Sequence, residues 1–167
     1  MNRFILYLIP SVAFLISPLV AFAQSGWTSA CSAGATIDEA SLSIYQTNGA
    51  SLLFRAGAIG TITARYNVAN CASPTSTTPP WTTFELGYSD RIGAEITATL
   101  FQVEPCSGET TTVCSMTTQR GVLLNCIKCT FPAGTIDFSN YVYYVQVDIS
   151  RSLGAVLSPQ ANTLRIY

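Results

Sequence analysis

The sequence contains no histidine. Histidine is the usual general base of serine and cysteine hydrolases and the commonest metal ligand in proteins. Its absence excludes Ser-His-Asp and Cys-His catalysis, and it would leave a zinc site with cysteine ligands alone. No run of Asp and Asn residues has the spacing of a calcium loop. We therefore expect no metal and no cofactor.

Charged residues are also scarce, at 10% of the chain, and Lys128 is the only lysine. A protein without a basic patch has nothing to follow a phosphate backbone, so we expect no nucleic-acid partner. Solubility must come from hydroxyl and amide side chains more than from charge. A surface of this kind can lie against a partner, which leaves self-association open.

The one long apolar run is N-terminal, and no later segment reaches the ~18 apolar residues of a transmembrane helix. Arg3 precedes this run, and Ala21-Phe22-Ala23 follows it with the small-x-small pattern of a cleavage site. We predict a cleaved signal peptide over residues 1–23 and a mature chain that begins at Gln24. The protein is then secreted, to the periplasm or the extracellular space, with residues 24–167 as a single domain.

The mature part has an even number of cysteines, which in an exported protein indicates disulfide bonds. They are Cys31, Cys71, Cys106, Cys114, Cys126 and Cys129. Many pairings satisfy this number, and we favour a bond between Cys106 and Cys114. The turn predicted between them would bring two hairpin arms within disulfide distance.

Two further pairs complete that prediction. Cys31 with Cys71 would anchor the N-terminal lead-in, and Cys126 with Cys129 is the remaining pair. A redox CxxC motif normally opens a helix, where the thiolate is stabilised. Phe131-Pro132 follows this one and predicts a turn, so we interpret the pair as structural.

Residues 141–151 show the clearest strand pattern of the chain. Apolar residues alternate there with polar ones, as in a strand with one face buried. β-Branched and aromatic residues dominate it, which favours a pleated surface. The inward series is Tyr141, Tyr143, Val145, Val147 and Ile149.

Shorter segments of this kind recur at residues 41–45, 51–55, 61–68, 81–88, 94–103, 111–116, 122–124 and 164–167. No long segment after the signal has a helical period, and turn residues separate the strands. We predict an all-β fold, a single antiparallel, jelly-roll-like β-sandwich stapled by disulfides, with an immunoglobulin-like Greek key as the alternative. The expected core contains Ile62, Tyr66, Phe84, Leu86, Ile96, Leu100, Val145, Val147 and Ile149.

Three local features refine this prediction. Residues 24–34 are small and polar, and we expect a loose lead-in there. Asn48-Gly49 is a strong hairpin-turn signal. In residues 94–103 the apolar side changes at Phe101 and Val103, which we interpret as a bulge or an end covered by a loop.

Paired carboxylates are the remaining route to acid–base catalysis. A glycosidase needs two carboxyl groups ~5–9.5 Å apart. Glu85 and Asp148 both fall on outward sides of predicted strands and can be neighbours in the fold. Nothing in the sequence brings them together, so we predict no catalytic residue.

Aromatic side chains are the stronger functional signal. Trp81 follows a Ser/Thr/Pro-rich loop, Trp27 lies in the lead-in, and Tyr144 faces the polar side of its strand. Exposed rings can stack on sugars or on protein partners, so these three residues are the candidate binding residues. For the two tryptophans we favour the other interpretation, in which they cap the ends of the core, since tryptophan is highly buried on average.

We therefore expect an exported binding or interaction module that does not catalyse. Its partner would be a glycan, a cell-surface protein or copies of itself. The alternatives are a secreted hydrolase that uses a carboxylate pair and a structural subunit of a cell-surface assembly.

Overall fold

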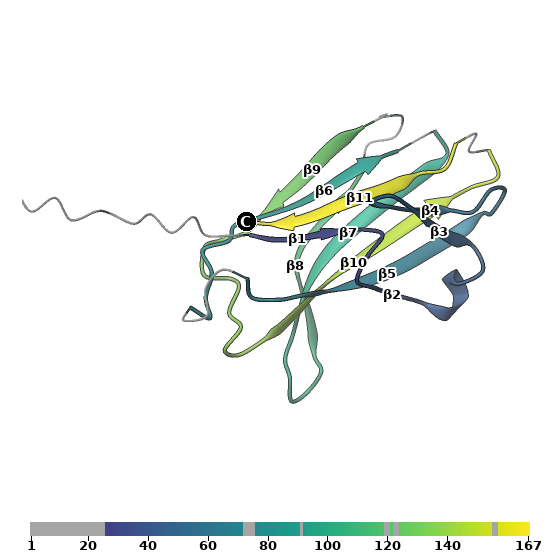
Figure 1. The fold of residues 1–167 in the computed structure, drawn as a ribbon. Helices are drawn as coiled ribbons and strands as arrows, with labels where there is room; N and C mark the ends of the chain where they lie inside the picture. Colours follow the sequence, from purple (N-terminus) through teal and green to yellow (C-terminus); the bar gives the residue numbers. More distant parts are fainter. Residues whose placement is uncertain (1–25, 72–75, 91, 119–120, 122–123, 155–156) are drawn as a thin grey trace, which may run out of the picture.

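The computed structural model describes residues 26–71, 76–90, 92–118, 121, 124–154 and 157–167. The predicted signal peptide and its cleavage site lie outside these residues, as does most of the strand predicted at 122–124. Within the described part, no helix is long and apolar enough to span a membrane. The helical content of that part is a single 3-10 turn, η1 (Glu39–Ser41), and the other elements are strands (Figure 1).

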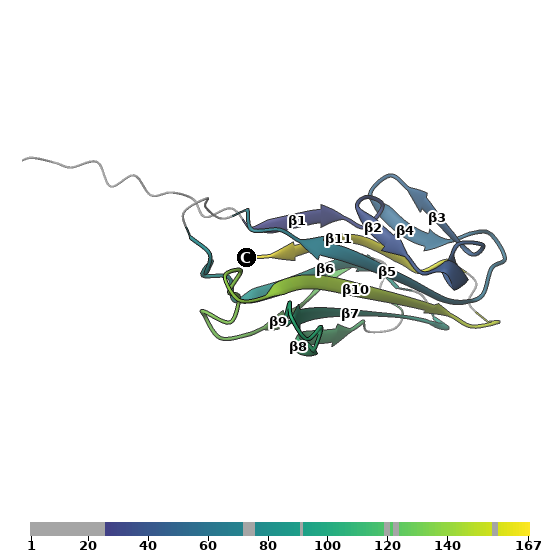
Figure 2. The same cartoon turned by 90° about the horizontal axis from the view of Figure 1, so that it is seen from below.

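The strands form two antiparallel sheets (Figures 1 and 2). In the six-stranded sheet the order is β3-β4-β11-β6-β9, and β1 also pairs with β11; in the five-stranded sheet it is β2-β5-β10-β7-β8. The first consists of β1 (Trp27–Ala30), β3 (Tyr45–Asn48), β4 (Ser51–Phe54), β6 (Thr83–Ser89), β9 (Asn125–Thr130) and β11 (Gln160–Ile166). The second consists of β2 (Ala35–Ile37), β5 (Gly60–Val68), β7 (Ala94–Val103), β8 (Thr110–Thr117) and β10 (Val142–Arg151).

The order in which the chain visits the sheets is that of a jelly roll. From β4 to β11 it changes sheet at every connection except β7–β8, a hairpin within the five-stranded sheet. The last strands are inserted between earlier ones, β10 between β5 and β7 and β11 between β4 and β6. This is the eight-stranded double Greek key of jelly-roll proteins. The predicted jelly-roll sandwich is confirmed, and the immunoglobulin-like alternative is not the topology found.

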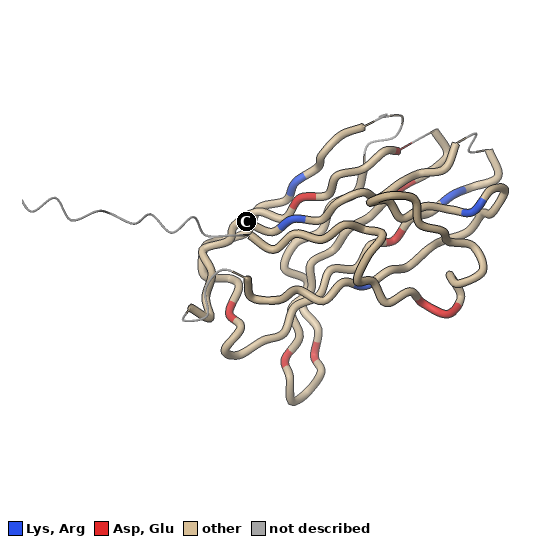
Figure 3. Tube along the Cα trace, viewed as in Figure 1, with Lys and Arg blue, Asp and Glu red and all other residues tan. Residues whose placement is uncertain are grey.

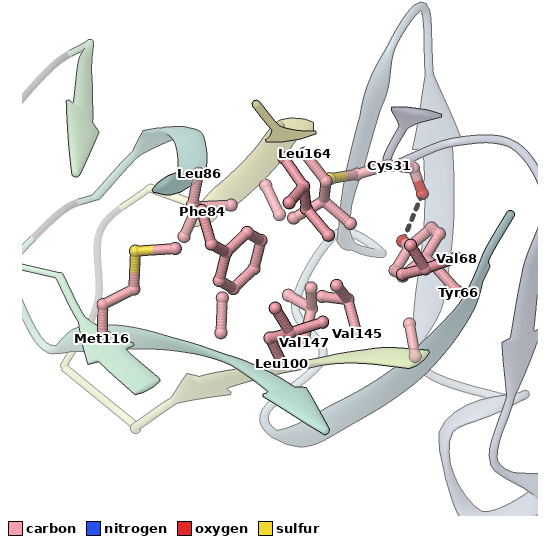
Figure 4. Packing of buried hydrophobic residues seen from close by; sticks show 14 of the residues in the cluster. Cys31, Tyr66, Val68, Phe84, Leu86, Leu100, Met116, Val145, Val147 and Leu164 are labelled. Atoms are coloured by element: carbon pink, nitrogen blue, oxygen red, sulfur yellow. Dashed lines mark hydrogen bonds between the residues drawn. The ribbon is translucent and has the colours of Figure 1, made fainter. Parts of the chain in front are cut away.

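The core lies between the sheets, with β10 at the centre of the five-stranded one. All nine residues predicted for the core are at most 1% exposed. Figure 4 shows Phe84 and Leu86 of β6 packed toward Val145 and Val147 of β10. Alternation thus directs the apolar residues of each strand to the opposite sheet, where their burial stabilises the fold at ~25 cal/mol per Å².

Two segments differ from the prediction. The N-terminal lead-in is not loose, because Trp27–Ala30 pairs along β11, with Trp27 opposite Ile166. The strand predicted at residues 41–45 is instead η1 and a turn, and the strand begins at Tyr45. The Asn-Gly hairpin is found, with Gly49 at φ 58° between β3 and β4.

The disulfide pairs also differ from the prediction. Cys114 of β8 is bonded to Cys129 of β9, with their Cα atoms 6.2 Å apart. This bond joins the two sheets at one edge of the sandwich. It rules out Cys126–Cys129, since β9 is extended there and positions i and i+3 lie ~10 Å apart on opposite faces.

The Cys106–Cys114 pair is wrong for a similar reason. Cys106 lies in the turn after β7, whereas Cys114 is several residues along β8, opposite Leu100, and faces inward. Cys31 is a fully buried thiol, and the predicted bond to Cys71 is not formed. The hydroxyl of Tyr66 donates a hydrogen bond to the Cys31 carbonyl at 2.7 Å (Figure 4).

Candidate functional site

The two tryptophans predicted as binding residues belong to the core. Trp81 is 1% exposed and Trp27 is 6% exposed, so neither offers a ring face to a ligand. The Trp81 ring packs edge-on against Phe138, with 6.0 Å between centroids. The other interpretation of the sequence, in which the tryptophans cap the core, is the one found, so these two are not binding residues.

Tyr144, the third candidate, lies on the outer face of the five-stranded sheet. It pairs across β10–β7 with Phe101, and the two half-buried rings stack with centroids 4.9 Å apart at an interplanar angle of 23°. Val142 and Val103 form the next outward pair, and Val142 is 51% exposed. We call these four residues the aromatic end. It presents apolar surface on an otherwise polar face.

Phe101 was missed as a site residue, although the sequence carried its signal. The change of apolar side in residues 94–103 was interpreted as a bulge or a covered end. A register shift does occur there, but it lies in the β7–β8 pairing between Leu100 and Phe101. The β7–β10 register is continuous, so Phe101 and Val103 keep their outward positions. The outward apolar pair is the feature that could have identified the site.

Beyond the aromatic end, polar side chains of β5 and β10 form a hydrogen-bonded row. The Asp148 carboxylate accepts from the Thr63 hydroxyl at 2.6 Å and from the Gln146 amide at 2.8 Å. The Gln146 carbonyl accepts from Arg65 Nε at 2.9 Å, and Arg65 binds Asp38 at 2.6 Å. Each group keeps lone pairs or N–H donors after these bonds. The row therefore holds polar groups in fixed positions at the surface.

Hydroxyl pairs continue this pattern across neighbouring strands. The pairs are Thr97 with Thr117 at 3.0 Å, Thr99 with Ser115 at 2.8 Å, and Thr61 with Ser150 at 3.1 Å. Each such cross-strand contact stabilises a sheet by ~0.2–1 kcal/mol. We call the outward side chains of β5, β7, β8 and β10 the ladder face.

A hollow of about 360 Å³ lies at the other end of the ladder face. Its lining includes Thr61, Glu95 and Ser150, which face outward, and two glycines, Gly60 and Gly93. Tyr144 and Ser150 are six positions apart on β10, which corresponds to ~20 Å of strand. The ladder face therefore runs from an aromatic end to a polar hollow.

The opposite outer face, that of the six-stranded sheet, carries a charged cluster. Glu85 of β6 lies in register between Lys128 of β9 and Arg165 of β11. Its carboxylate contacts Lys128 at 3.0 Å and Arg165 at 3.5 Å, and accepts a hydrogen bond from the Tyr167 hydroxyl at 3.1 Å. Both cations lie near the Tyr167 ring, 5.5 and 5.0 Å from its centroid. Figure 3 shows the row as blue, red and blue on neighbouring strands.

The pKa values of this cluster follow from its geometry. Burial raises the pKa of Glu85, but hydrogen bonds from Lys128 and Tyr167 and the charges of Lys128 and Arg165 outweigh burial, so the pKa is below its usual value. Hydrogen bonds with Tyr167 and Glu85 raise the pKa of Lys128. Glu85 and Lys128 are therefore both ionised at neutral pH. Two cations and one carboxylate give the cluster one net positive charge.

The carboxylate pair considered for a hydrolase is not formed. Glu85 and Asp148 lie on the outer faces of different sheets and point away from each other. The carboxyl groups with shifted pKa values, those of Glu85, Glu104 and Asp137, all shift downward. A glycosidase acid needs a raised pKa. These groups therefore do not favour the hydrolase alternative.

The CxxC segment does not form a chemical site either. Cys126 and Cys129 lie on opposite faces of β9, and Cys129 is in the disulfide. Within the described part of the chain, no three metal-ligating side chains gather at one place.

No protein-family model matches the sequence, and a search of curated proteins found no match either. Solved structures do resemble this fold. One, described as the xylan-binding module CBM15, is 14% identical over 86% of this chain and 95% of its own, with a TM-score of 0.50. A family 11 carbohydrate-binding module from Clostridium thermocellum is 10% identical over 90% and 92% of the two chains, with a TM-score of 0.44. At 14% identity and a TM-score of 0.50, the likeness to the xylan-binding module shows a shared fold.

Proposed function

We propose that the protein is a non-catalytic carbohydrate-binding module that holds an extended neutral polysaccharide on the ladder face. The observation that carries this proposal is the stacked, half-buried pair of Phe101 and Tyr144 beside an ordered row of hydroxyl, amide and carboxylate groups. The ~20 Å between Tyr144 and Ser150 favours a ligand that is long in one direction.

The chemistry of the face matches a sugar chain. A pyranose ring has an apolar C–H face, which the aromatic end can cover, and a rim of hydroxyls, which the row can hydrogen-bond. Side chains already fixed by mutual bonds lose little entropy when a ligand binds. With Asp38 and the hollow included, the face has three carboxylates (Asp38, Glu95 and Asp148) against two guanidiniums (Arg65 and Arg151), a balance that does not favour an acidic ligand.

The structural likeness supports this function at the level of the fold. The solved structure described as a xylan-binding module matches over 86% of this chain and 95% of its own length, and its description names xylan as what it binds. Export through the predicted signal peptide would place the protein where polysaccharides are found. A surface-protein partner and a structural subunit remain the alternatives, and neither is favoured by a specific feature of the ladder face.

The test is binding of the mature chain to a panel of neutral polysaccharides that includes xylan, measured by affinity electrophoresis and calorimetry. Tyr144→Ala should weaken binding at least about fivefold, since an aromatic contact is worth ~1 kcal/mol or more. Tyr144→Phe keeps the ring and should retain most of the affinity. Binding that is indifferent to Tyr144→Ala, or absent across the panel, would refute the proposal.

A further inference from the structure

A groove of about 460 Å³ lies on the outer face of the six-stranded sheet. Gly87 of β6 forms its floor, between Cys126 of β9 and Thr163 of β11, which are its partners in register. This volume is within the ~300–1,000 Å³ of small-molecule sites. The remaining lining residues are Tyr88, Leu124, Asn125 and Asn162.

The floor of the groove depends on glycine. A Cβ atom at position 87 would lie 2.5 Å from Thr163 Oγ1, so any larger residue would displace that hydroxyl. Glycine in the interior of a central strand weakens the strand, and it often lies where a ligand approaches the backbone. Gly87 is itself buried, so the missing side chain at position 87 makes room for the Thr163 hydroxyl, which packs over β6 and forms the floor together with it.

The walls combine amide donors with one apolar side. Asn162 Oδ1 accepts from the Ser51 hydroxyl at 2.7 Å, and Asn125 Oδ1 accepts from the Cys126 backbone N–H at 2.9 Å. Among the residues that the structure describes, neither NH₂ group has an acceptor, so both asparagines can donate to a ligand. Leu124 is 76% exposed and supplies the apolar side. A sugar ring, with hydroxyls at its rim and C–H groups on its face, matches both.

The charged cluster adjoins the groove. Lys128 and Arg165 are each two residues beyond a wall residue on the same face, ~6.6 Å farther along their strands. Their side chains are 52% and 51% exposed, and both keep N–H donors after binding Glu85. A carboxylate at this end of the groove would meet two cations in a cluster with one net positive charge.

We propose that this groove is a second binding site, for a carboxylated sugar such as a uronic-acid residue. The ring lies in the groove against Thr163, the asparagine amides hydrogen-bond its hydroxyls, and the carboxylate pairs with Lys128 and Arg165. The site does not depend on the ladder face, which has the opposite charge and points to the other side of the sandwich.

The first test uses oligogalacturonate and its carboxyl-reduced, neutral counterpart as matched probes. We expect calorimetry to show binding of the acidic probe that weakens with added salt. Bound oligogalacturonate should also slow alkylation of Cys126, which lines the groove. Cys106, exposed in the β7–β8 turn, should react at an unchanged rate. Equal affinity for the reduced probe, or no protection of Cys126, would overturn the proposal.

The second test separates this site from the ladder face. Lys128→Gln should weaken oligogalacturonate binding roughly five- to tenfold, as loss of a charge-assisted hydrogen bond predicts. Arg65→Gln removes the same charge from the opposite face, and Tyr144→Ala removes the ladder-face ring, so neither should change it. Polyglutamate that binds as tightly as oligogalacturonate would show a general cation patch and refute the sugar site. If Tyr144→Ala loses neutral-polysaccharide binding but still binds oligogalacturonate, the two sites are separate, as proposed.

Discussion

The two outer faces of this sandwich are built on similar sheets but differ in how they handle their carboxylates. On the ladder face, Asp148 is one acceptor in a lateral row with Thr63 and Gln146. On the charged face, Glu85 is only 7% exposed, covered by Lys128, Arg165 and Tyr167. The Asp148 carboxylate is therefore accessible at the surface, whereas the Glu85 carboxylate is covered by the two cations that it binds.

The difference follows from which side chains the neighbouring strands place in register. In the five-stranded sheet, short hydroxyl side chains bond laterally across β5–β10 and across β7–β8, so the surface carries two series of cross-strand hydrogen-bonded pairs. Around β6, a glycine and a glutamate are flanked by longer side chains, which produces a groove beside an ionic cluster. The net charge of the side chains differs in the same way: it is negative on the ladder face and positive on the outer face of the six-stranded sheet.

The largest effect should come from the bond that joins the two sheets. The Cys114–Cys129 disulfide closes a loop of sequence separation 15, for which the chain-entropy model gives ~3 kcal/mol. We expect the double change to alanine to lower the free energy of unfolding by about that amount in denaturant titrations. Cys106→Ala should have almost no effect. Peptide mapping under non-reducing conditions that links Cys114 to another cysteine would contradict this assignment.

Glu85→Ala should have the next largest effect. Three groups lose their shared acceptor, but both cations are half-exposed and can be hydrated, so we expect a loss of ~2 kcal/mol. The matched change on the ladder face is Asp148→Ala. It removes the acceptor of two uncharged donors, Thr63 and Gln146, which can bond to water instead, so the free energy of unfolding should fall by ~1 kcal/mol or less. Equal losses in chemical denaturation would mean that the two carboxylates are alike after all.

The stability of the charged face should also depend on pH in acid. Because the folded-state pKa of Glu85 is below its ordinary value of 4.5, the unfolded chain binds its proton first as the pH falls. Its contribution is therefore complete above that ordinary value and is lost as the pH falls through the folded pKa. Glu85→Gln should flatten the pH dependence of the free energy of unfolding below that value. An unchanged slope would contradict the ion-pair assignment.

The sequence predicted the fold well because alternation is a local property with a global consequence. In residues 141–151 and 61–68, the period of two assigns every side chain to the core or to the surface without knowledge of the partner strand. The same reasoning failed at β1, whose Trp27–Ala30 segment is short and polar and becomes a strand only through β11, at the far end of the chain.

The candidate site was predicted less completely, because it depends on register. Tyr144 could be placed on the outer face from its own strand, but its stacking partner Phe101 required the β7–β10 pairing. The Cys114–Cys129 bond likewise required the edges of two sheets to meet. Gly87 gave no signal at all, since a groove floor exists only once Thr163 and Cys126 flank it.

The smallest effect tests whether the hydroxyl row of the ladder face serves stability or binding. Thr99→Val keeps a β-branched side chain and removes the hydroxyl that pairs with Ser115 at 2.8 Å. Both hydroxyls are exposed and exchange this bond for one with water, so the free energy of unfolding should change by less than ~0.5 kcal/mol. Polysaccharide affinity should fall roughly two- to threefold, since a sugar hydroxyl loses one partner in a fixed position. A clear loss of stability with unchanged affinity would instead make the row a sheet-stabilising device, and Thr97→Val, one pair along β7, would then show the same pattern.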